Sequence, residues 1–210
     1  MPIQFAMTCL SLDHIHHYGV DLSLLVETSC CDEMKSDRDF LISLLQNKPN
    51  DPSLKERIFE LEEAQPAELS RDVSLLRGVW DLRWSSSSQP WLRQSPWLEN
   101  LQALDPERNR GCNLLRFRGP FGAIGAITVE ASLNVVDSQR VEVKFLKGGW
   151  LGPRFPGRGQ LKLLREVQQS FPAWLDITVL DDQIRICRGN AGTTFVLLRL
   201  ENMEPNELIQ

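Results

Sequence analysis

The side chains most often used in catalysis are unevenly placed along this sequence. All three histidines, His14, His16 and His17, lie near the N-terminus, so a Ser-His or Cys-His catalytic pair would have to take its base from that segment. The sequence contains no phosphate-binding loop, HExxH motif, nucleophile elbow or dinucleotide fingerprint. This weighs against hydrolase activity, and we expect a protein that is not an enzyme.

A second group of polar residues lies close together in the last third of the chain. It consists of Asp176, Asp181, Asp182, Arg185 and Arg188. If these carboxylates and guanidinium groups converged, they could form a polar active site. On paired strands and their turns, however, such residues more often form salt links and turn caps, and we interpret them in that way.

The cysteines could in principle form disulfides or bind a metal. The five are Cys9, Cys30, Cys31, Cys112 and Cys187. An odd, scattered set is typical of a reducing compartment rather than of a disulfide framework. The N-terminal cysteines and histidines together lack the spacing of a zinc site. We therefore predict no metal and no cofactor.

Aromatic residues on predicted loops are the best candidates for a binding role, because they are interleaved with basic residues in two segments. These residues are Trp91, Arg93, Trp97, Trp150, Arg154, Phe155 and Arg158. Amphipathic rings beside cations suit the headgroup region of a membrane. The alternative is that they fold inward and cap the protein, since exposed aromatic rings are costly. Both interpretations place them near the mouth of a binding cavity.

The elements that must position these residues are mainly β-strands. Apolar and polar residues alternate in three consecutive runs across residues 174–200, which predicts a β-meander with turns at 181–182 and 188–192. Alternation predicts further strands at 77–86, 112–118, 123–136 and 140–146. About seven antiparallel strands with short turns close most economically as an up-and-down barrel. A half-open sheet wrapped by helices is the alternative.

Details of this pattern give further expectations. In the first strand, Trp80, Leu82 and Trp84 share a face and are predicted to point inward. Residues 87–111 predict an ordered excursion, and 148–159 hold too much Gly and Pro for regular structure. A short helix is predicted at 160–170 from the spacing of its apolar residues.

Two helices are predicted before the first strand. The first runs from Ser36 to about Asn47, and the second begins at Asp51-Pro52 and ends before Pro66. Each carries a narrow apolar stripe, which favours packing against the barrel. Residues 1–33 show no sustained period, and we expect them to be poorly structured.

Within the predicted meander, several residues resemble the C-terminal signature of the plastid lipid-associated proteins, or fibrillins. They are Trp174 to Thr178, with Asp176, then Asp181, Arg185, Arg188, Gly189 and Gly192. Upstream, Gly78, Trp80 and Leu82 resemble the family's Gly-x-Trp entry into its first strand, a pattern shared with lipocalins. Leu61-Glu62 and Gln65-Pro66 resemble its helical lead-in. The chain departs from the family at Trp84, where a tyrosine is usual, and in a Trp-rich insertion after Ser88.

The resemblance implies a mainly β fold, α+β overall, in which a lipocalin-like antiparallel β-barrel follows two N-terminal α-helices. The expected segments are a poorly structured 1–33, a helical lead-in at 34–72, the barrel at 73–203 and a tail at 204–210. In such barrels the first-strand tryptophan, here Trp80, plugs the closed end. An arginine of the last strand commonly crosses it, and Arg199 is best placed by order.

The resemblance also implies a function, namely non-catalytic binding of hydrophobic small molecules such as lipids, carotenoids or quinones. The setting would be a photosynthetic membrane or lipid droplet, with the protein attached peripherally. Because no transit or signal peptide is recognisable, we expect a cyanobacterial protein of the cytoplasmic side of the thylakoid. One alternative is an enzyme on the same barrel, such as a bilin-chromophore lyase or isomerase, which would need a charge-lined cavity. Another is a scaffold with a filled barrel.

The charge distribution is compatible with a membrane surface as partner. The net charge is −5, yet residues 140–165 carry seven basic side chains and one acidic side chain. A basic segment can serve nucleic acid, anionic lipid or the protein's own acidic helices. The sequence has no arginine-rich tail or RNA-binding signature, so we predict no nucleic-acid partner. No run reaches the roughly 18 to 20 apolar residues that cross a bilayer, so contact would be peripheral.

Overall fold

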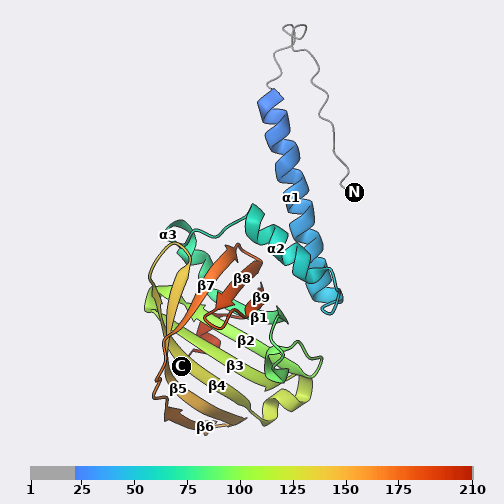
Figure 1. Ribbon diagram of the computed structural model, residues 1–210. Helices are drawn as coiled ribbons and strands as arrows, with labels where there is room; N and C mark the ends of the chain where they lie inside the picture. Colours follow the sequence, from blue (N-terminus) through green and yellow to red (C-terminus); the bar gives the residue numbers. More distant parts are fainter. Residues whose placement is uncertain (1–21, 210) are drawn as a thin grey trace, which may run out of the picture. The chain divides into compact units, whose positions relative to one another are not determined.

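The computed structural model describes residues 22–209 (Figure 1). The chain divides into two units, Met1–Ser36 and Asp37–Gln210. Helix α1 (Leu22–Asn47) begins in the first unit and ends in the second. The prediction that this helix starts at Ser36 was wrong, because residues 22–33 are helical without the apolar recurrence on which that prediction relied.

The second unit contains a closed antiparallel barrel of eight strands, which confirms the predicted fold class. Around the barrel the strand order is β4-β3-β2-β1-β9-β8-β7-β5, and pairing of β4 with β5 closes the ring. The strands are β1 (Gly78–Ser85), β2 (Leu98–Asp105), β3 (Arg110–Phe117), β4 (Ala126–Val135), β5 (Arg140–Phe155), β7 (Ala173–Leu180), β8 (Ile184–Gly189) and β9 (Thr194–Arg199).

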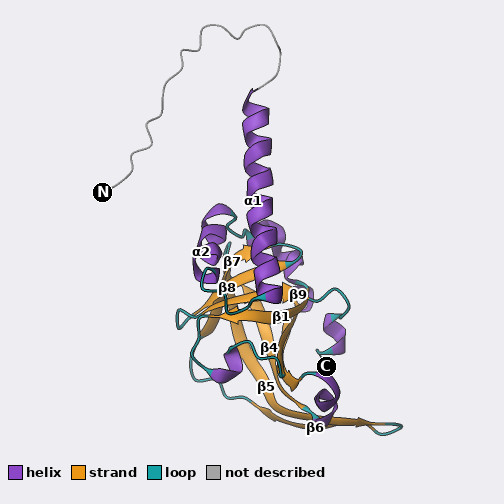
Figure 2. Cartoon of the chain, turned by 90° about the vertical axis from the view of Figure 1, so that its right-hand side faces the viewer, coloured by secondary structure: helices purple, strands orange, loops and turns teal. Residues whose placement is uncertain are grey.

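Strand β6 (Gly159–Glu166) extends the sheet beyond the barrel. The first residues of β5, 140–143, pair with β7, whereas residues 147–155 pair with β6. The resulting β5–β6 hairpin projects past the other strands (Figure 2). The predicted irregular segment at 148–159 and the predicted helix at 160–170 were therefore both wrong.

The glycines of β5 have a packing role that explains the first of these errors. The Trp150 ring lies so close to Gly125 and Gly152 that a Cβ on either glycine would come within 2.3 and 2.6 Å of it. Glycine in a strand often marks such a close approach. Gly152, one of the glycines that argued against a strand, thus makes room for a ring on that strand.

Two clusters of buried side chains cover parts of the outer face of the barrel. Leu41 and Leu45 of α1, with Leu54 and Ile58 of α2 (Leu54–Ala64), pack against β7, β8 and β9 (Figure 2). The other cluster lies on β1 to β5, where the C-terminal residues Leu208 and Ile209 pack against it. The predicted packing of the two helices on the barrel is confirmed.

Strand β1 changes face partway along its length. Trp80 and Leu82 are buried inside the barrel, as predicted. The register of β1 with β9 shifts between Leu82 and Trp84, however, and Trp84 packs against the helix cluster instead. A β-bulge inserts one residue and so reverses the direction of those that follow. The prediction that Trp84 faces inward was wrong for this reason.

Arg83, at the bulge, connects β1 to helix α1. Its Nη2 donates to the carbonyl of Gln46, near the end of α1, at 3.1 Å.

Candidate functional site

The barrel encloses a cavity of about 490 Å³. Most of its wall is apolar, and the polar side chains in it are uncharged: Asn100, Gln102, Cys112, Asn113, Asn190 and Thr193. The apolar wall includes Leu82, Leu104, Leu115, Ile127, Val129, Ala131, Leu133, Val143, Phe145, Leu175 and Phe195. No charged side chain is among the described residues that line it. A volume of this size is in the range of pockets that hold small organic ligands.

Strand register places the open end of this cavity. Asn100 of β2 pairs with Leu115 of β3, Leu115 pairs with Ile127 of β4, and Ile127 pairs with Trp150 of β5. These four residues therefore lie at one level of the barrel, and all but Trp150 line the cavity. The loop between β1 and β2 and the β5–β6 hairpin both continue from this level, away from the closed end. Trp91 of that loop, in the short helix Pro90–Leu92, lines the cavity.

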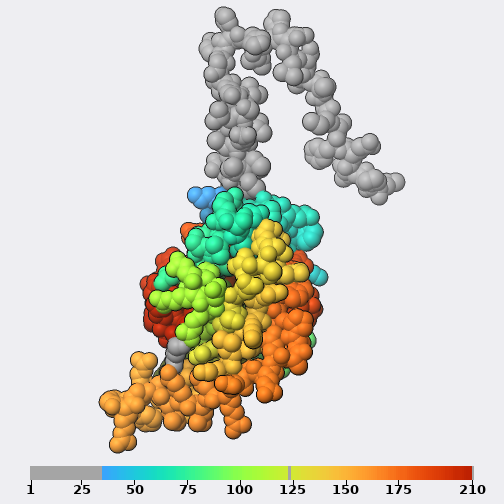
Figure 3. All heavy atoms as spheres, turned by 90° about the vertical axis from the view of Figure 1, so that its left-hand side faces the viewer, coloured from blue at the N-terminus to red at the C-terminus, as the bar shows by residue number. Residues whose placement is uncertain are grey.

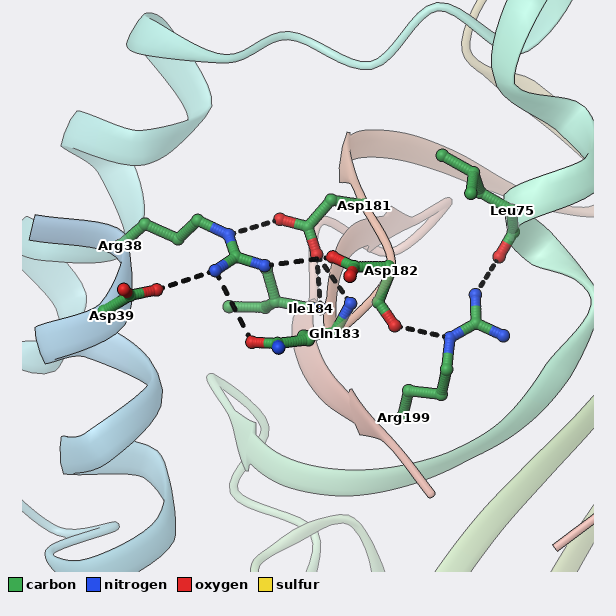
Figure 4. Close-up of polar contacts among 8 residues, drawn as sticks. All are labelled: Arg38, Asp39, Leu75, Asp181, Asp182, Gln183, Ile184 and Arg199. Carbon is green, nitrogen blue, oxygen red and sulfur yellow. Dashed lines mark hydrogen bonds and ion pairs between the residues drawn. The ribbon is translucent and has the colours of Figure 1, made fainter. Parts of the chain in front are cut away.

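Trp80 and Arg199 lock the closed end. The Trp80 side chain is 0% exposed, and its indole nitrogen donates to the Leu76 carbonyl at 3.0 Å. The Arg199 guanidinium lies 4.4 Å from the Trp80 ring centroid, so the expected crossing by the last strand is confirmed. Arg199 also donates to the carbonyls of Leu75 and Asp182 (Figure 4). Gly78 allows this arrangement, because a Cβ there would lie 2.3 Å from the Arg199 guanidinium.

Arg185 of β8 is the other cation near the Trp80 ring. Its side chain is 0% exposed, and its guanidinium lies 5.0 Å from the Trp80 centroid. Nη2 donates to the amide oxygen of Gln102, which itself lines the cavity. Burial lowers the pKa of Arg185 to about 10. The guanidinium therefore remains charged at neutral pH despite its removal from water.

Four other charged residues of the meander, Asp176, Asp181, Asp182 and Arg188, have ion-pair partners. Asp176 accepts from Arg140 at 2.7 and 2.8 Å, and Arg188 pairs with Glu62 of α2. Asp181 accepts from Arg38 of α1 at 2.6 Å and from two backbone N–H groups of its turn (Figure 4). These contacts tie helices and strands together and leave the carboxylates engaged. The structure shows them as links and caps rather than as a converged polar site.

Burial would raise the pKa of Asp181, but its hydrogen bonds act in the opposite direction. The Arg38 guanidinium and the N–H groups of Ile184 and Gln183 outweigh burial, so the pKa of Asp181 lies below its ordinary value.

The two glycines of the signature, Gly189 and Gly192, lie at the turn between β8 and β9. Gly189 lines the cavity, and Gly192 adopts a φ of 74°, which the turn before β9 requires.

The seven aromatic and basic candidates do not form one continuous ring. Trp91, Arg93 and Trp97 belong to the β1–β2 loop, and all three are exposed. Arg154, Phe155 and Arg158 are exposed on the β5–β6 hairpin, whereas Trp150 is half-buried against its glycines. Only Trp91 of the seven is among the described residues lining the main cavity. Arg154 borders a separate hollow of about 350 Å³.

Further apolar residues surround the open end, and the sequence did not single them out. The inner face of the wall continues onto the hairpin, because Ile127, Trp150 and Leu163 are partners across β4, β5 and β6. Ile127 is 57% exposed and Leu163 is 61% exposed. Other exposed apolar side chains are Phe117, Phe121, Ile124, Leu161, Val167 and Phe171. In Figure 3 the hairpin, in orange, projects from the lower edge of the unit.

Several predicted features fall outside what the structure describes. The three histidines and Cys9 lie outside the described residues, as do the side chains of Cys30 and Cys31. Where side chains are described, no three His, Cys, Asp or Glu residues come together in a way that could hold a metal ion. Over the same part of the chain, no helix combines the length and apolar character needed to span a bilayer.

Comparison with known proteins gives consistent matches. The PAP_fibrillin family model matches residues 44–198. A "Light-induced protein, chloroplastic" of Solanum tuberosum is 28% identical, with 69% of this chain and 58% of that protein covered. "Plastid lipid-associated protein 1, chloroplastic" of Brassica campestris is 26% identical, with 87% and 64% covered. A "Chromoplast-specific carotenoid-associated protein, chromoplastic" of Cucumis sativus is 27% identical, with 69% and 59% covered. The chain thus spans less than two thirds of the length of these relatives. No solved structure matches it.

Proposed function

Because the chain belongs to the PAP_fibrillin family, we propose that its barrel binds a hydrophobic small molecule in the central cavity without catalysing a reaction. The observation that carries this proposal is the cavity itself, which is about 490 Å³ in volume, mostly apolar and lined by no charged side chain among the described residues. Apolar walls with a few amide groups favour an apolar ligand and fix its orientation.

The cavity also separates this proposal from the alternatives. A lyase or isomerase for a charged chromophore would need ionised groups in the cavity to bind and protonate its substrate, and the described lining offers four amides, one hydroxyl and one thiol instead. A purely structural barrel would fill its interior with side chains. The barrel of this protein instead leaves an unfilled cavity beside Gln102 and Leu104, which a purely structural role does not explain.

The names of the relatives support the ligand class. Two of them are named for an association with plastid lipid and with carotenoid. By analogy, lipids, carotenoids and quinones are the ligands to test first. We place the protein at the surface of a photosynthetic membrane or lipid droplet, attached peripherally through the open end of the barrel. The expected cytoplasmic, cyanobacterial setting remains a prediction, since the relatives above are plant plastid proteins.

The proposal is tested by filling the cavity. Val129 lines the cavity wall on β4, whereas Val136, which follows the same strand, is 50% exposed and lies outside the described lining. Val129→Trp should occupy the space a ligand needs, and Val136→Trp is the matched control. Lipids and pigments that co-purify with each protein are extracted and quantified by mass spectrometry.

We expect the wild type and Val136→Trp to retain the same apolar compound, and Val129→Trp to lose about tenfold or more of it while it remains folded by circular dichroism. Equal retention by all three would place the compound outside the cavity. A wild type that retains no apolar compound, and takes up none of the three ligand classes on titration, would overturn the proposal.

A further inference from the structure

Arg185 is a buried cation without an acidic partner among the described residues. Of its three guanidinium nitrogens, Nη2 donates to Gln102, while Nε and Nη1 are buried with no hydrogen-bond partner. Each of the other signature residues with a charge has an oppositely charged partner: Asp176 with Arg140, Asp181 with Arg38, and Arg188 with Glu62. Arg185 alone in this set is left uncompensated.

The surroundings of Arg185 increase the cost of its charge. The neighbouring cation is Arg199, whose positive charge acts against it. Trp80 offers only the face of its ring, at 5.0 Å. Buried charges are normally paired, and buried donors without acceptors destabilise a protein. An arginine in this state is therefore better explained by a partner that joins the folded protein than by the stability of the protein alone.

Gln102 connects this arginine to the cavity. It lines the cavity wall, and its amide oxygen is held by Arg185. Gln102 pairs with Trp80 across β1 and β2, and Arg185 pairs with Leu197 across β8 and β9, so both residues lie near the closed end. A ligand that moved the Gln102 amide aside would meet the guanidinium at the end of an apolar channel.

We propose that Arg185 binds the carboxylate of a long-chain amphiphile, which enters head first, displaces the Gln102 amide and leaves its apolar tail in the cavity. This inference rests on the proposed function and specifies the chemistry of the ligand. The carboxylate accepts from Nη2 in place of Gln102 and from Nε, and it supplies the missing negative charge. A planar carboxylate matches a guanidinium, and hydrogen bonds between two ionised groups are the strong ones.

The test compares an acid with its uncharged ester. The delipidated protein is titrated with oleic acid and with methyl oleate, and the dissociation constants are measured by displacement of a fluorescent fatty-acid probe. Three variants are compared with the wild type: Arg185→Met, Arg185→Lys and the control Arg188→Met. Arg188 is on the same strand but exposed, where it pairs with Glu62. Thermal unfolding of each variant checks that it folds.

We expect the wild type and Arg188→Met to bind oleic acid about tenfold or more tightly than methyl oleate, the range that hydrogen bonds to charged groups give. Arg185→Met should lose this preference and still bind methyl oleate, and Arg185→Lys should keep part of it. Since Arg185→Met removes an unpaired buried charge, its melting temperature should be equal or higher.

The outcomes separate this inference from the proposed function. If the wild type binds the ester as well as the acid, or Arg185→Met keeps the preference for the acid, the carboxylate site is wrong while the cavity still binds an apolar ligand. If neither compound binds and the cavity-filling test also fails, the proposed function itself is wrong. If Arg185→Met does not fold, Arg185→Lys decides: a preference for the acid that is smaller than that of the wild type supports the site, and a preference equal to that of the wild type overturns it.

Discussion

At the scale of single residues, Trp80 holds the closed end of the barrel together. Its ring contacts Arg199 and Arg185, and its indole nitrogen is bonded to Leu76. Trp80→Ala removes a large, fully buried ring and leaves a cavity, so we expect it to lower the free energy of unfolding by about 3–5 kcal/mol. Urea denaturation monitored by circular dichroism measures this.

Trp97 is the matched control for that substitution, since it is 74% exposed. Trp97→Ala should change the free energy of unfolding by less than about 0.5 kcal/mol. If Trp80→Ala also cost less than about 1 kcal/mol, the ring would not support the closed end.

Asp181 gives a second prediction at this scale, because its pKa is lowered in the folded state. A carboxylate of this kind stabilises the fold above its unfolded pKa, and the contribution disappears as pH falls through the lower folded pKa. Asp181→Ala should therefore cost about 1.5–3 kcal/mol at pH 7, through lost hydrogen bonds to an ionised group. The difference from the wild type should shrink below about pH 4.

The measurement is urea denaturation of both proteins at a series of pH values. Arg38→Gln removes one partner of Asp181 but leaves its two backbone bonds, so it should lose a smaller part of the stability. A wild-type-to-variant difference that stays constant from pH 7 to acid would show that the charge of Asp181 is unimportant.

At the scale of elements, helix α1 contributes through its C-terminal part. Among the described side chains, contacts with the rest of the second unit run from Arg38, which pairs with Asp181, to the buried Leu41 and Leu45. We therefore predict that residues 1–33 are dispensable and that a chain beginning at Met34 keeps its melting temperature. Leu45→Ala, in contrast, should cost about 2–5 kcal/mol. Differential scanning calorimetry compares the three proteins, and loss of cooperative unfolding on truncation would contradict the prediction.

The strands show what the sequence could predict. Where one face of a strand is apolar and the other polar, as in β4, alternation located the strand. It failed for β2, whose inner face carries Asn100 and Gln102 while its outer residues Leu101 and Ala103 are buried. Polar and apolar residues alternate only over 100–103, because Glu99 and Asn100 are both polar and Ala103 and Leu104 are both apolar, and so short a run does not predict a strand. These amides belong to the cavity wall, so the same feature that hid the strand is part of the site.

The prediction for residues 148–170, which form the β5–β6 hairpin, was wrong for a different reason. Leu161, Leu163 and Leu164 have a spacing that also fits a helix, and β6 pairs with a glycine-rich part of β5. The local sequence does not distinguish a helix from a strand here, because the strand forms only through its pairing with β5. The isolation of Arg185 could not be predicted either, since an arginine in a signature does not reveal whether an acidic residue lies nearby in space.

At the scale of the whole molecule, the open end combines exposed apolar side chains with basic ones. The hairpin carries Phe155 and Leu163, which are 50% and 61% exposed, beside Arg154 and Arg158. Each basic residue near an anionic surface adds about 1 kcal/mol, and inserted apolar side chains add burial. Neither contribution alone would hold the protein firmly, so binding to lipid should be weak and salt-sensitive.

Liposome flotation with anionic thylakoid-type lipids tests this surface. The wild type should float at low salt and less at high salt, because added ions screen the arginines. A variant that combines Phe155→Ser, Leu163→Ser and Arg154→Gln should float less than the wild type at both salt concentrations.

Trp150 is left unchanged in this variant, since its ring packs against Gly125 and Gly152 and its loss would disturb the fold. The matched control is Phe59→Ser, a residue of α2 that is 54% exposed and lies far along the chain from the hairpin. Because the control removes an equally exposed ring, its flotation should equal that of the wild type. If the hairpin variant floats like the control while the cavity still retains its ligand, the aromatic and basic residues of the hairpin do not form the membrane contact, and ligand would have to enter the open end from solution.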